Sequence, residues 1–307
     1  MSDSVVSVVR VGDAVREALD AGRGVVALET TLIVHGLPRP ENLEVARELE
    51  KTVTSTQAVP ATIGVLRGTP VVGLADNEIE QLANSTDQVA KLSTRDLGFA
   101  IAKGLDGATT VASTITLATR AGIAVMATGG LGGVHRHARE TYDESADLTA
   151  LSKEPVIVVC SGVKSILDVQ ATLERLETLA VPVAGYRTEA FPGFYVRETP
   201  HRLNWRFESP GDVATAFRAH RRFSDSAMVI ANPVPESDAL SENLHAAALA
   251  QAEEEADVAG VSGKDVTPFL LARFAEYTKG ASVRANRALV IENAKLAGEI
   301  AVELANR

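Results

Sequence analysis

The sequence predicts an α/β fold with a mixed, largely parallel central sheet. Short apolar runs alternate with segments of helical periodicity along most of the 307 residues, a pattern typical of strands connected by helices. Hydrophobic residues make up 46% of the chain but aromatic residues only 4%, so small aliphatic side chains must fill the core. Such a composition favours a sheet covered by helices. We expect one domain over residues 1–307, because no repeat or low-complexity linker interrupts the pattern.

The first quarter of the chain predicts two helices and three strands. Residues 11–21 have the apolar spacing of an amphipathic helix, and a glycine follows where helices often end. The apolar run at 25–28 predicts a buried strand. In 42–52, charged residues separate apolar residues at helical spacing, which predicts a second helix. The short apolar runs 61–64 and 71–73 predict strands joined by a Gly-Thr-Pro turn.

The middle of the chain contains one ambiguous segment. Residues 96–103 are expected to be helical. Residues 109–120 are rich in both β-branched and small side chains, so they fit either a strand or a buried helix. Residues 123–128 predict a strand that runs into a glycine-rich sequence, and 156–160 predict a buried central strand.

The last third predicts strands at 182–185 and 228–231 and long helices at 244–259 and 281–306. Between them, residues 191–206 are rich in proline and arginine and lack periodicity. We expect this segment to form a loop over a site.

Charge and composition exclude several functions. The chain has 30 lysine and arginine residues against 40 aspartate and glutamate residues, a formal net charge of −10, which argues against a nucleic-acid partner. Cys160 stands alone in an apolar run and is expected to be a buried hydrophobic residue. The six histidines lack metal-binding spacing, and no serine lies in a nucleophile elbow. No signal peptide or membrane span is apparent, so we expect a cytoplasmic protein without a membrane partner.

A lysine follows the central strand directly. After 156–160 the chain continues Ser-Gly-Val-Lys, and we expect Lys164 to open a helix. Partial burial and the positive end of a helix dipole would both favour the neutral amine, which can attack a carbonyl carbon. The alternative is a solvated lysine in the first turn of a helix.

Two more charged residues lie at expected element ends. Glu29 follows the strand at 25–28, and open α/β sheets bind ligands beyond the carboxyl ends of their strands. Partial burial would raise the pKa of Glu29 and suit it to general acid–base catalysis; the alternative is a structural salt bridge or a helix cap. Lys91 precedes the helix at 96–103 and is either a functional lysine or a solvated cation.

A glycine-rich segment, 127–135, follows the strand at 123–128. Four glycines in five residues allow backbone N–H groups to converge on a phosphate, although a structural turn explains them equally well. The next segment, 142–147, contributes carboxylates and a hydroxyl, ligands that suit Mg²⁺ or Mn²⁺ rather than a closed zinc site. The alternative is that these carboxylates cap the following helix.

Several of these segments, taken together and in order, resemble the pseudouridine-5′-phosphate glycosidase family, which includes the indigoidine-cluster A proteins. The resemblance extends through nearly the whole chain, which makes it far more specific than any one motif. The matching segments are 27–38, 60–64, 91–96, 107–114, 127–136, 145–148, 160–168 and 231–235.

The resemblance implies a fold, an activity and a set of site residues. The fold would be a three-layer α/β/α sandwich assembled as a homotrimer. The activity would be reversible cleavage of pseudouridine 5′-phosphate to uracil and ribose 5-phosphate with a divalent metal, usually Mn²⁺. By position, Lys164 would be the Schiff-base nucleophile, Glu29 the proton donor and Asp143 the metal ligand. The implied substrate contacts are Lys91, Val111, Thr128, Gly129, Gly130, His135, Ser145, Ala146, Asp147 and Asn286.

The chemistry of a C–C glycosidic bond agrees with this assignment. Such a bond has no leaving oxygen to protonate, so the two-carboxylate route of O-glycosidases fits poorly. Lys164 would instead attack C1′ of the opened ribose and form an iminium that assists cleavage of the bond to uracil C5. Glu29 would move a proton at ring opening or on the base. The glycine loop and its neighbours would hold the 5′-phosphate.

Two other functions use the same residues. One is a Schiff-base lyase or aldolase acting on another sugar phosphate; the other is a catalytically silent sugar-phosphate-binding protein. Two departures from the family pattern bear on the site. The turn at 278–282 lacks an expected glycine, and Glu144 stands beside Asp143 where a hydrophobic residue is frequent; these could alter substrate contacts and metal affinity respectively.

Overall fold

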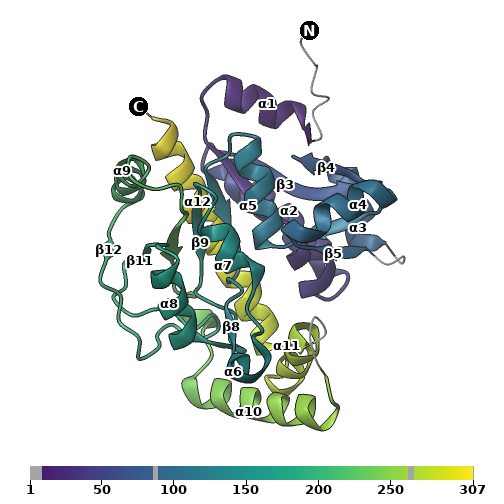
Figure 1. Ribbon diagram of the computed structural model, residues 1–307, viewed down its shortest axis with the longest axis vertical. Helices are drawn as coiled ribbons and strands as arrows, with labels where there is room; N and C mark the ends of the chain where they lie inside the picture. The colour runs from purple at the N-terminus through teal and green to yellow at the C-terminus, as the bar shows by residue number, and fades with distance from the viewer. Residues whose placement is uncertain (1–8, 86–88, 262–265, 307) are drawn as a thin grey trace.

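The computed structural model describes residues 9–85, 89–261 and 266–306. It has the expected three-layer arrangement, a mixed and mostly parallel sheet with helices on both faces (Figure 1). The strands of the main sheet are β1 (Arg10–Val11), β2 (Val25–Glu29), β3 (Val59–Leu66), β4 (Thr69–Val72), β5 (Ala90–Leu92), β6 (Gly107–Thr109), β7 (Val125–Ala127), β9 (Ile157–Cys160), β11 (Val183–Tyr186), β12 (Arg206–Phe207) and β13 (Met228–Ala231). A separate antiparallel pair consists of β8 (Val134–His135) and β10 (Leu167–Asp168).

The sheet is parallel where it forms the core and antiparallel near one edge. Its order is β1-β4-β3-β2-β7-β9-β13-β11-β12, and β6 pairs with both β3 and β5. The strands from β3 to β12 run parallel to their neighbours along this path, whereas β4 and β6 are antiparallel to β3. The carboxyl ends of β2, β7, β9 and β13 therefore lie at one edge of the sheet.

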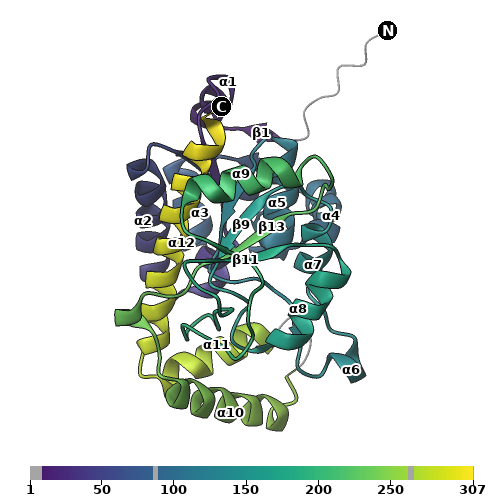
Figure 2. The same ribbon diagram turned by 90° about the vertical axis from the view of Figure 1, so that its left-hand side faces the viewer.

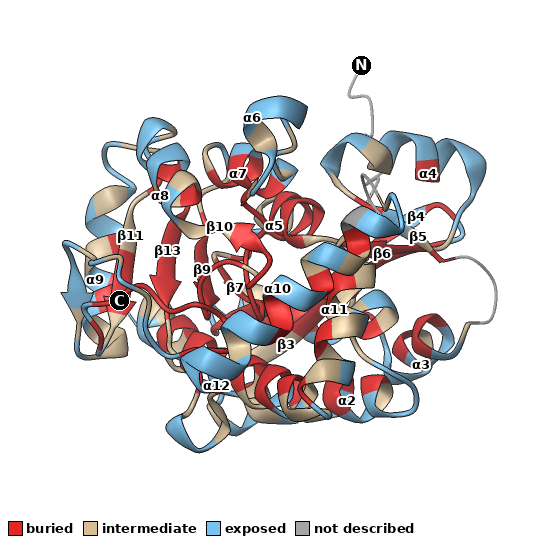
Figure 3. Cartoon of the chain, turned by 90° about the horizontal axis from the view of Figure 1, so that it is seen from below, coloured by how far each residue is buried: buried red, intermediate tan, exposed pale blue. Residues whose placement is uncertain are grey.

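Helices cover both faces. On one face lie α2 (Glu41–Ser55), α9 (Pro210–His220) and the long α12 (Ala281–Ala305), and on the other α5 (Val111–Arg120), α7 (Ala146–Leu151) and α8 (Val169–Thr178), with the buried sheet between them (Figure 3). At the carboxyl ends of the strands, α10 (Glu242–Val258) and α11 (Val266–Tyr277) close the lower end of the molecule (Figures 1 and 2). The remaining helices are α1 (Asp13–Asp20), α3 (Asp76–Asn84), α4 (Leu97–Lys103) and α6 (Ala138–Thr141), with short turns at Leu32–Gly36, Thr94–Asp96 and Glu236–Asp238.

Small aliphatic side chains fill the core, as the composition predicts. All four residues of β9 are fully buried, including Cys160, and burial of each large aliphatic side chain contributes roughly 1.5–3 kcal/mol. Small residues let elements pack closely: a Cβ on Gly298 of α12 would lie 2.1 Å from the Thr56 hydroxyl oxygen at the end of α2. Among the described residues, no helix is long and apolar enough to cross a membrane.

The ambiguous segment 109–120 is a buried helix, α5, preceded by the short strand β6. Residues 111–118 are all buried, hydroxyl-bearing ones included. Those hydroxyls find acceptors: the Ser113 hydroxyl donates to the carbonyl of Leu92 at 2.6 Å, and the Thr114 hydroxyl to the hydroxyl of Thr109 at 2.9 Å. These bonds offset the burial of polar groups, so a β-branched composition is compatible with a buried helix.

The hairpin between β3 and β4 turns earlier than predicted. Arg67 and Gly68 form the turn, with φ angles of 48° and 76°, while Thr69 and Pro70 already belong to β4. Glycine adopts such a positive φ without steric cost, which explains its place in the turn.

Candidate active site

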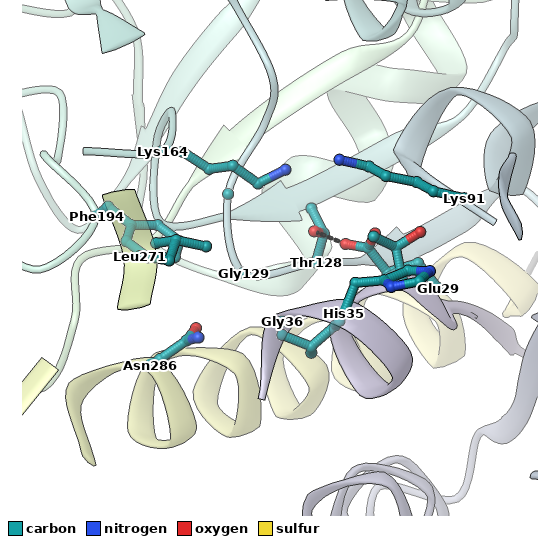
Figure 4. Close-up of a pocket in the computed structure, with 13 residues that line it drawn as sticks. Glu29, His35, Gly36, Lys91, Thr128, Gly129, Lys164, Phe194, Leu271 and Asn286 are labelled. Atoms are coloured by element: carbon teal, nitrogen blue, oxygen red, sulfur yellow. Dashed lines mark hydrogen bonds between the residues drawn. The ribbon is translucent and has the colours of Figure 1, made fainter. Parts of the chain in front are cut away.

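The predicted chemical residues meet at the carboxyl edge of the sheet. Glu29 is the last residue of β2, Thr128 follows β7, and Lys164 lies four residues beyond β9. Asn286 approaches from α12, on the side opposite Lys164 (Figure 4). Parallel strands bring residues distant in sequence to one edge, which is where open α/β sheets place their sites.

Two adjoining cavities share this edge. The inner cavity, about 60 Å³, is lined by apolar side chains such as Leu32, Phe194 and Leu271. The outer cavity, about 630 Å³, is lined mainly by hydroxyl and charged groups. Four residues line both: Glu29, Thr31, Lys91 and Lys164. The candidate catalytic groups therefore stand at the boundary between an apolar and a polar compartment.

Glu29 is held in a buried position suited to proton transfer. Its residue is 7% exposed, and the Thr128 hydroxyl donates a hydrogen bond to its carboxylate (Figure 4). Burial raises the pKa of Glu29 above its ordinary value, while Lys164 and the Thr128 hydrogen bond oppose that rise. The carboxyl group thus retains a proton to higher pH than an exposed glutamate, as its sequence position predicts.

Lys164 lies in the cavity, but the prediction that a helix begins at this residue is wrong. Helix α8 begins at Val169, and Lys164 belongs to an irregular segment after β9. Its backbone N–H donates to the carbonyl of Leu131 at 3.0 Å, and its carbonyl accepts from the N–H of Leu167 at 3.0 Å. A turn fastened to the glycine loop, rather than a helix terminus, fixes this lysine, so the helix-dipole argument does not apply.

Lys91 faces Lys164 across the cavity. The two side chains leave β5 and the segment after β9 and point toward one another (Figure 4). Loss of hydration and then repulsion by Lys164 lower the pKa of Lys91. Two amines that face each other disfavour simultaneous protonation, which provides a physical route to a neutral amine in the site.

The glycine loop is a packing element more than a phosphate nest. The N–H groups of Leu131 and Gly132 donate to the carbonyl of Gly162 and the carboxylate of Asp147 at 2.9 and 2.8 Å. A Cβ on Gly130 would lie 2.6 Å from the ring of Phe194, and one on Gly132 only 2.2 Å from the Ser145 hydroxyl oxygen. The structure therefore favours the structural reading of these glycines, although Gly129 and Gly130 do line the inner cavity.

Asp147 braces the outer cavity. Its residue is 4% exposed, and its two carboxylate oxygens accept from the N–H groups of Ala112 and Gly132 at 2.9 and 2.8 Å. Ser145, rather than an aspartate, caps α7 by accepting from the N–H of Asp147 at 3.2 Å. Ser145, Ala146 and Asp147 all line the outer cavity, as expected of a substrate-binding segment.

Asp143 can hold a hydrated cation but does not belong to a closed metal site. Its carboxylate is 3.9 Å from Nε2 of His135, and both residues line the outer cavity. Glu144 is engaged by Arg175, with 2.9 Å between Oε2 and Nε. No group of three or more histidine, cysteine, aspartate or glutamate side chains among the described residues could hold a metal. One carboxylate facing a water-accessible cavity fits Mn²⁺ or Mg²⁺ that keeps most of its waters.

Two buried oxygens of the inner cavity have no hydrogen-bond partner among the described residues. These are Oδ1 of Asn286, in a residue 6% exposed, and the hydroxyl of Thr31. Buried polar atoms are usually hydrogen-bonded, so both are available to a ligand. Sequence reasoning identified Asn286 only through the family resemblance and missed Thr31, which its position two residues beyond Glu29 could have indicated.

Val111 is not placed like the other expected contacts. Its side chain is fully buried at the first residue of α5, and it lines neither of the two cavities. Any contact with a ligand would have to come through its backbone. In its place the outer cavity gains residues that the sequence did not single out: Ser93, Arg95 and Thr110.

The altered turn at 278–282 is well ordered by hydrogen bonds. The Thr278 hydroxyl donates to the carbonyl of Phe274 at 2.7 Å and to the Ser282 hydroxyl at 2.9 Å. Helix α12 begins directly afterwards and carries Asn286 into the inner cavity. The missing glycine therefore does not displace Asn286.

Comparison with known proteins gives a consistent result. The family model described as indigoidine synthase A-like protein matches residues 14–303. A pseudouridine-5′-phosphate glycosidase from Salinispora tropica is 54% identical over 300 residues, which cover 97% of this chain and 92% of that protein. Another, from Herpetosiphon aurantiacus, is 51% identical over 291 residues, covering 94% of this chain and 96% of that protein.

Two solved structures resemble this one over their full lengths. A prealnumycin C-glycosynthase, AlnA, crystallised with ribulose 5-phosphate, superposes with a TM-score of 0.91 at 41% identity, and 98% of each chain is covered. An indigoidine synthase A-like protein from Thermotoga maritima superposes with a TM-score of 0.89 at 38% identity, covering 99% of this chain and all of that one.

Proposed function

The chain belongs to the indigoidine synthase A-like family, and from this premise we propose that it reversibly cleaves the C–C glycosidic bond of pseudouridine 5′-phosphate, giving uracil and ribose 5-phosphate. Curated relatives about half identical in sequence are named as the enzyme of that reaction. One observation carries the proposal: a lysine and a buried, proton-retaining glutamate, Lys164 and Glu29, face the same cavity.

The two compartments suit the two halves of the substrate. The uracil ring is neutral and planar, and the inner cavity offers the apolar Phe194 and Leu271 together with the unpartnered oxygens of Thr31 and Asn286. The phosphate is dianionic, and the outer cavity offers Lys91 and Arg95 together with the hydroxyls of Ser93, Thr110 and Ser145. In this orientation the scissile bond crosses the boundary where Lys164 stands.

The covalent steps follow from the amine at that boundary. The amine of Lys164 bonds to C1′ as the C1′–O4′ bond breaks and the ribose ring opens. A proton first adds to C5, which makes that carbon tetrahedral and leaves positive charge shared by C6 and N1. The nitrogen lone pair then forms the C1′=N iminium while the C1′–C5 bond breaks, and the electrons of that bond restore the C5=C6 double bond, which yields uracil. Water hydrolyses the iminium to the aldehyde of ribose 5-phosphate and frees the amine of Lys164.

Glu29 supplies the proton. Burial keeps its carboxyl group protonated to higher pH than usual, so it can donate to O4′ at ring opening or to C5 before the C1′–C5 bond breaks. The hydrogen bond from Thr128 orients the carboxyl group. Lys91, which lines both cavities, balances the charge of the phosphate.

We also propose that the reaction uses Mn²⁺ held by Asp143 with its hydration waters in the outer cavity. A divalent cation there would neutralise charge on the phosphate or the base and order nearby waters. The chain's own role is to present the carboxylate of Asp143, with His135 beside it, to a water-accessible cavity.

The deciding experiment measures two products. Uracil release from pseudouridine 5′-phosphate, followed chromatographically with Mn²⁺ present, tests the reaction; release from the phosphate ester but not from pseudouridine supports the phosphate compartment. Borohydride added with ribose 5-phosphate should reduce the iminium and attach a pentityl phosphate to Lys164, located by peptide mass spectrometry. Turnover without any trapped adduct, and with Lys164→Ala still active, would overturn the Schiff-base route.

The second candidate is a C–C lyase or synthase for another sugar phosphate. The AlnA neighbour is named a C-glycosynthase and was crystallised with ribulose 5-phosphate, which supports a candidate reaction with another acceptor or another pentose phosphate. A folded, Mn²⁺-loaded sample that forms the borohydride adduct yet never releases uracil would favour this candidate. Absence of both would favour a silent sugar-phosphate-binding protein.

We further propose a cytoplasmic homotrimer, as the family resemblance implies. Light scattering of the purified chain measures the assembly directly: a mass of three chains supports the proposal, and a stable monomer contradicts it.

A further inference from the structure

A second, larger cavity lies on the other side of the segment that carries Lys164. It measures about 940 Å³ and is enclosed by the loop 193–201, the start of α8 and the start of α10. Helix α8 lies just above α10 (Figures 1 and 2). The side chain of Lys164 faces the active cavities, whereas the next residue, Ser165, lines this second cavity. Leu167 lines both the second cavity and the outer one, so residues 164–167 form the wall between them.

The second cavity contains two buried polar atoms without protein partners. The hydroxyl of Ser165, a residue 6% exposed, accepts and donates no hydrogen bond within the described chain. Nε2 of His245, on the first turn of α10, is likewise buried and unbonded. Unpartnered buried polar atoms are rare, and finding two in one cavity indicates a ligand that completes their hydrogen bonds.

The electrostatics of this cavity favour a neutral ligand. Its lining includes the carboxylates of Asp168, Glu198 and Glu242, which repel phosphates. Arg136 also lines it but is paired with Glu253, 3.0 Å from Nε to Oε1. Burial, and then Arg136, lower the pKa of His245 to about 4, so its imidazole is neutral at pH 7 and can either donate or accept.

The chemical composition of the lining adds a second criterion. Apolar side chains of Leu167, Val169 and Val196 stand among the polar ones. A planar molecule with apolar faces and a hydrogen-bonding edge matches such a lining. Uracil has these properties: it is uncharged, and N–H donors alternate with carbonyl acceptors around its ring. Ribose 5-phosphate is dianionic and lacks them.

We propose that this cavity is a second binding site, specific for a neutral amide-bearing heterocycle, and that uracil occupies it. The hydroxyl of Ser165 and the imidazole of His245 bind its polar edge, while the carboxylates exclude the phosphorylated product. Only the choice of uracil rests on the proposed function; the site itself rests on the cavity and its unpartnered atoms.

Equilibrium dialysis of radiolabelled uracil against the full chain tests the proposal. We expect two uracil molecules per wild-type chain, one in the inner cavity and one in the second cavity. Ala246 lines the second cavity and is exposed, so Ala246→Trp should obstruct the cavity beside His245 without disturbing the core and reduce the count to one. Ala247 is its exposed neighbour on α10 but does not line the cavity, so Ala247→Trp should keep two.

The rate of uracil release from pseudouridine 5′-phosphate distinguishes a failure of the second site from a failure of the proposed reaction. Ala246→Trp should release uracil from pseudouridine 5′-phosphate at the wild-type rate, because it lies outside the catalytic cavities. A uracil count that Ala246→Trp leaves unchanged would overturn the second site whatever the activity. If the wild-type chain never turned over pseudouridine 5′-phosphate, the proposed reaction would be contradicted. If Ala246→Trp nevertheless removed one bound uracil from that chain, the second site would still be supported.

Discussion

The inner and outer cavities differ in how they can recognise a ligand. The inner cavity is small and apolar, with two unpartnered oxygens fixed in its wall, so shape and a few hydrogen bonds decide what enters. The outer cavity is ten times larger and is lined by cations, hydroxyls and carboxylates, so charge decides which ligand binds there. Under the proposed function, specificity for the base and affinity for the phosphate can therefore be altered separately, and the proposed catalytic residues Glu29 and Lys164 are among the four residues common to both cavities.

Removing the amine at the boundary should have the largest effect. Lys164→Ala should lower kcat by about 10⁶, the scale seen when a covalent nucleophile is removed, because neither cavity holds a replacement positioned at C1′. Uracil release by quenched-flow or long incubation measures it. The variant should still bind ribose 5-phosphate, since Lys91 and the outer cavity remain; loss of binding along with turnover would mean a folding defect instead.

Removing the proposed proton donor, Glu29, should have the second largest effect on turnover. Glu29→Gln should lower kcat by roughly 10²–10⁴, and the wild-type rate should fall as pH rises through the raised pKa of Glu29, because the proton donor is then lost. The pH profile of kcat measures this descending limb. If Glu29→Gln kept both the rate and that limb, another group would be the donor.

Glu29→Gln should also change how the free energy of unfolding depends on pH. A carboxyl group whose pKa is raised in the folded protein stabilises it below its ordinary pKa of 4.5, and that contribution is lost as pH rises through the raised value. Glutamine stays neutral, so the free energy of unfolding of Glu29→Gln should exceed that of wild type increasingly above pH 4.5. Denaturant melts at several pH values test this; parallel curves would contradict the burial argument.

Removing a positive charge should change the affinity for the phosphate more than the affinity for a neutral base, even at Lys91, which lines both cavities. Lys91→Met should raise KM for pseudouridine 5′-phosphate by about 10–100-fold, the cost of one charge-assisted hydrogen bond, with little effect on binding of free uracil. Lys103→Met is a matched control, because Lys103 is exposed in the last turn of α4, away from both cavities. An equal loss of uracil affinity in Lys91→Met would contradict the division between the compartments.

How far the sequence predicted these features depends on what determines each one. Strand β13 was predicted to the residue, because the apolar run 227–231, bounded by Ser226 and Asn232, has one favourable arrangement in a buried sheet. Glu29 was placed correctly for a similar local reason, since it ends such a run. The helix expected at Lys164 was wrong because tertiary contacts decide that segment: Val163 pairs with Leu131, and Gly162 adopts a φ of 89°.

The roles of the glycine loop and of the unpartnered oxygens could not be read from the sequence. Glycine is used for phosphate nests and for close packing alike, and only the distances from Gly130 to Phe194 and from Gly132 to Ser145 separate the two uses. Likewise, the sequence does not indicate whether the side-chain amide of a helical asparagine is hydrogen-bonded. Asn286 and Asn293 lie on the same helix, both buried, and differ only in their surroundings.

Asn286 and Asn293 provide the most selective test of the inner cavity, and the effects expected there are the smallest. Asn293 donates to the carbonyl of Thr128 at 2.8 Å and accepts from Asn232 at 3.0 Å, whereas Oδ1 of Asn286 has no partner in the described part of the chain. Asn293→Ala should therefore destabilise the protein by about 1–3 kcal/mol by leaving buried groups unpaired. Asn286→Ala should leave the melting temperature nearly unchanged and weaken uracil binding only about 2–10-fold. Thermal melts and uracil titrations on both variants measure the contrast. If Asn286→Ala lost stability and kept uracil affinity, Asn286 would be a structural residue and the base would bind elsewhere.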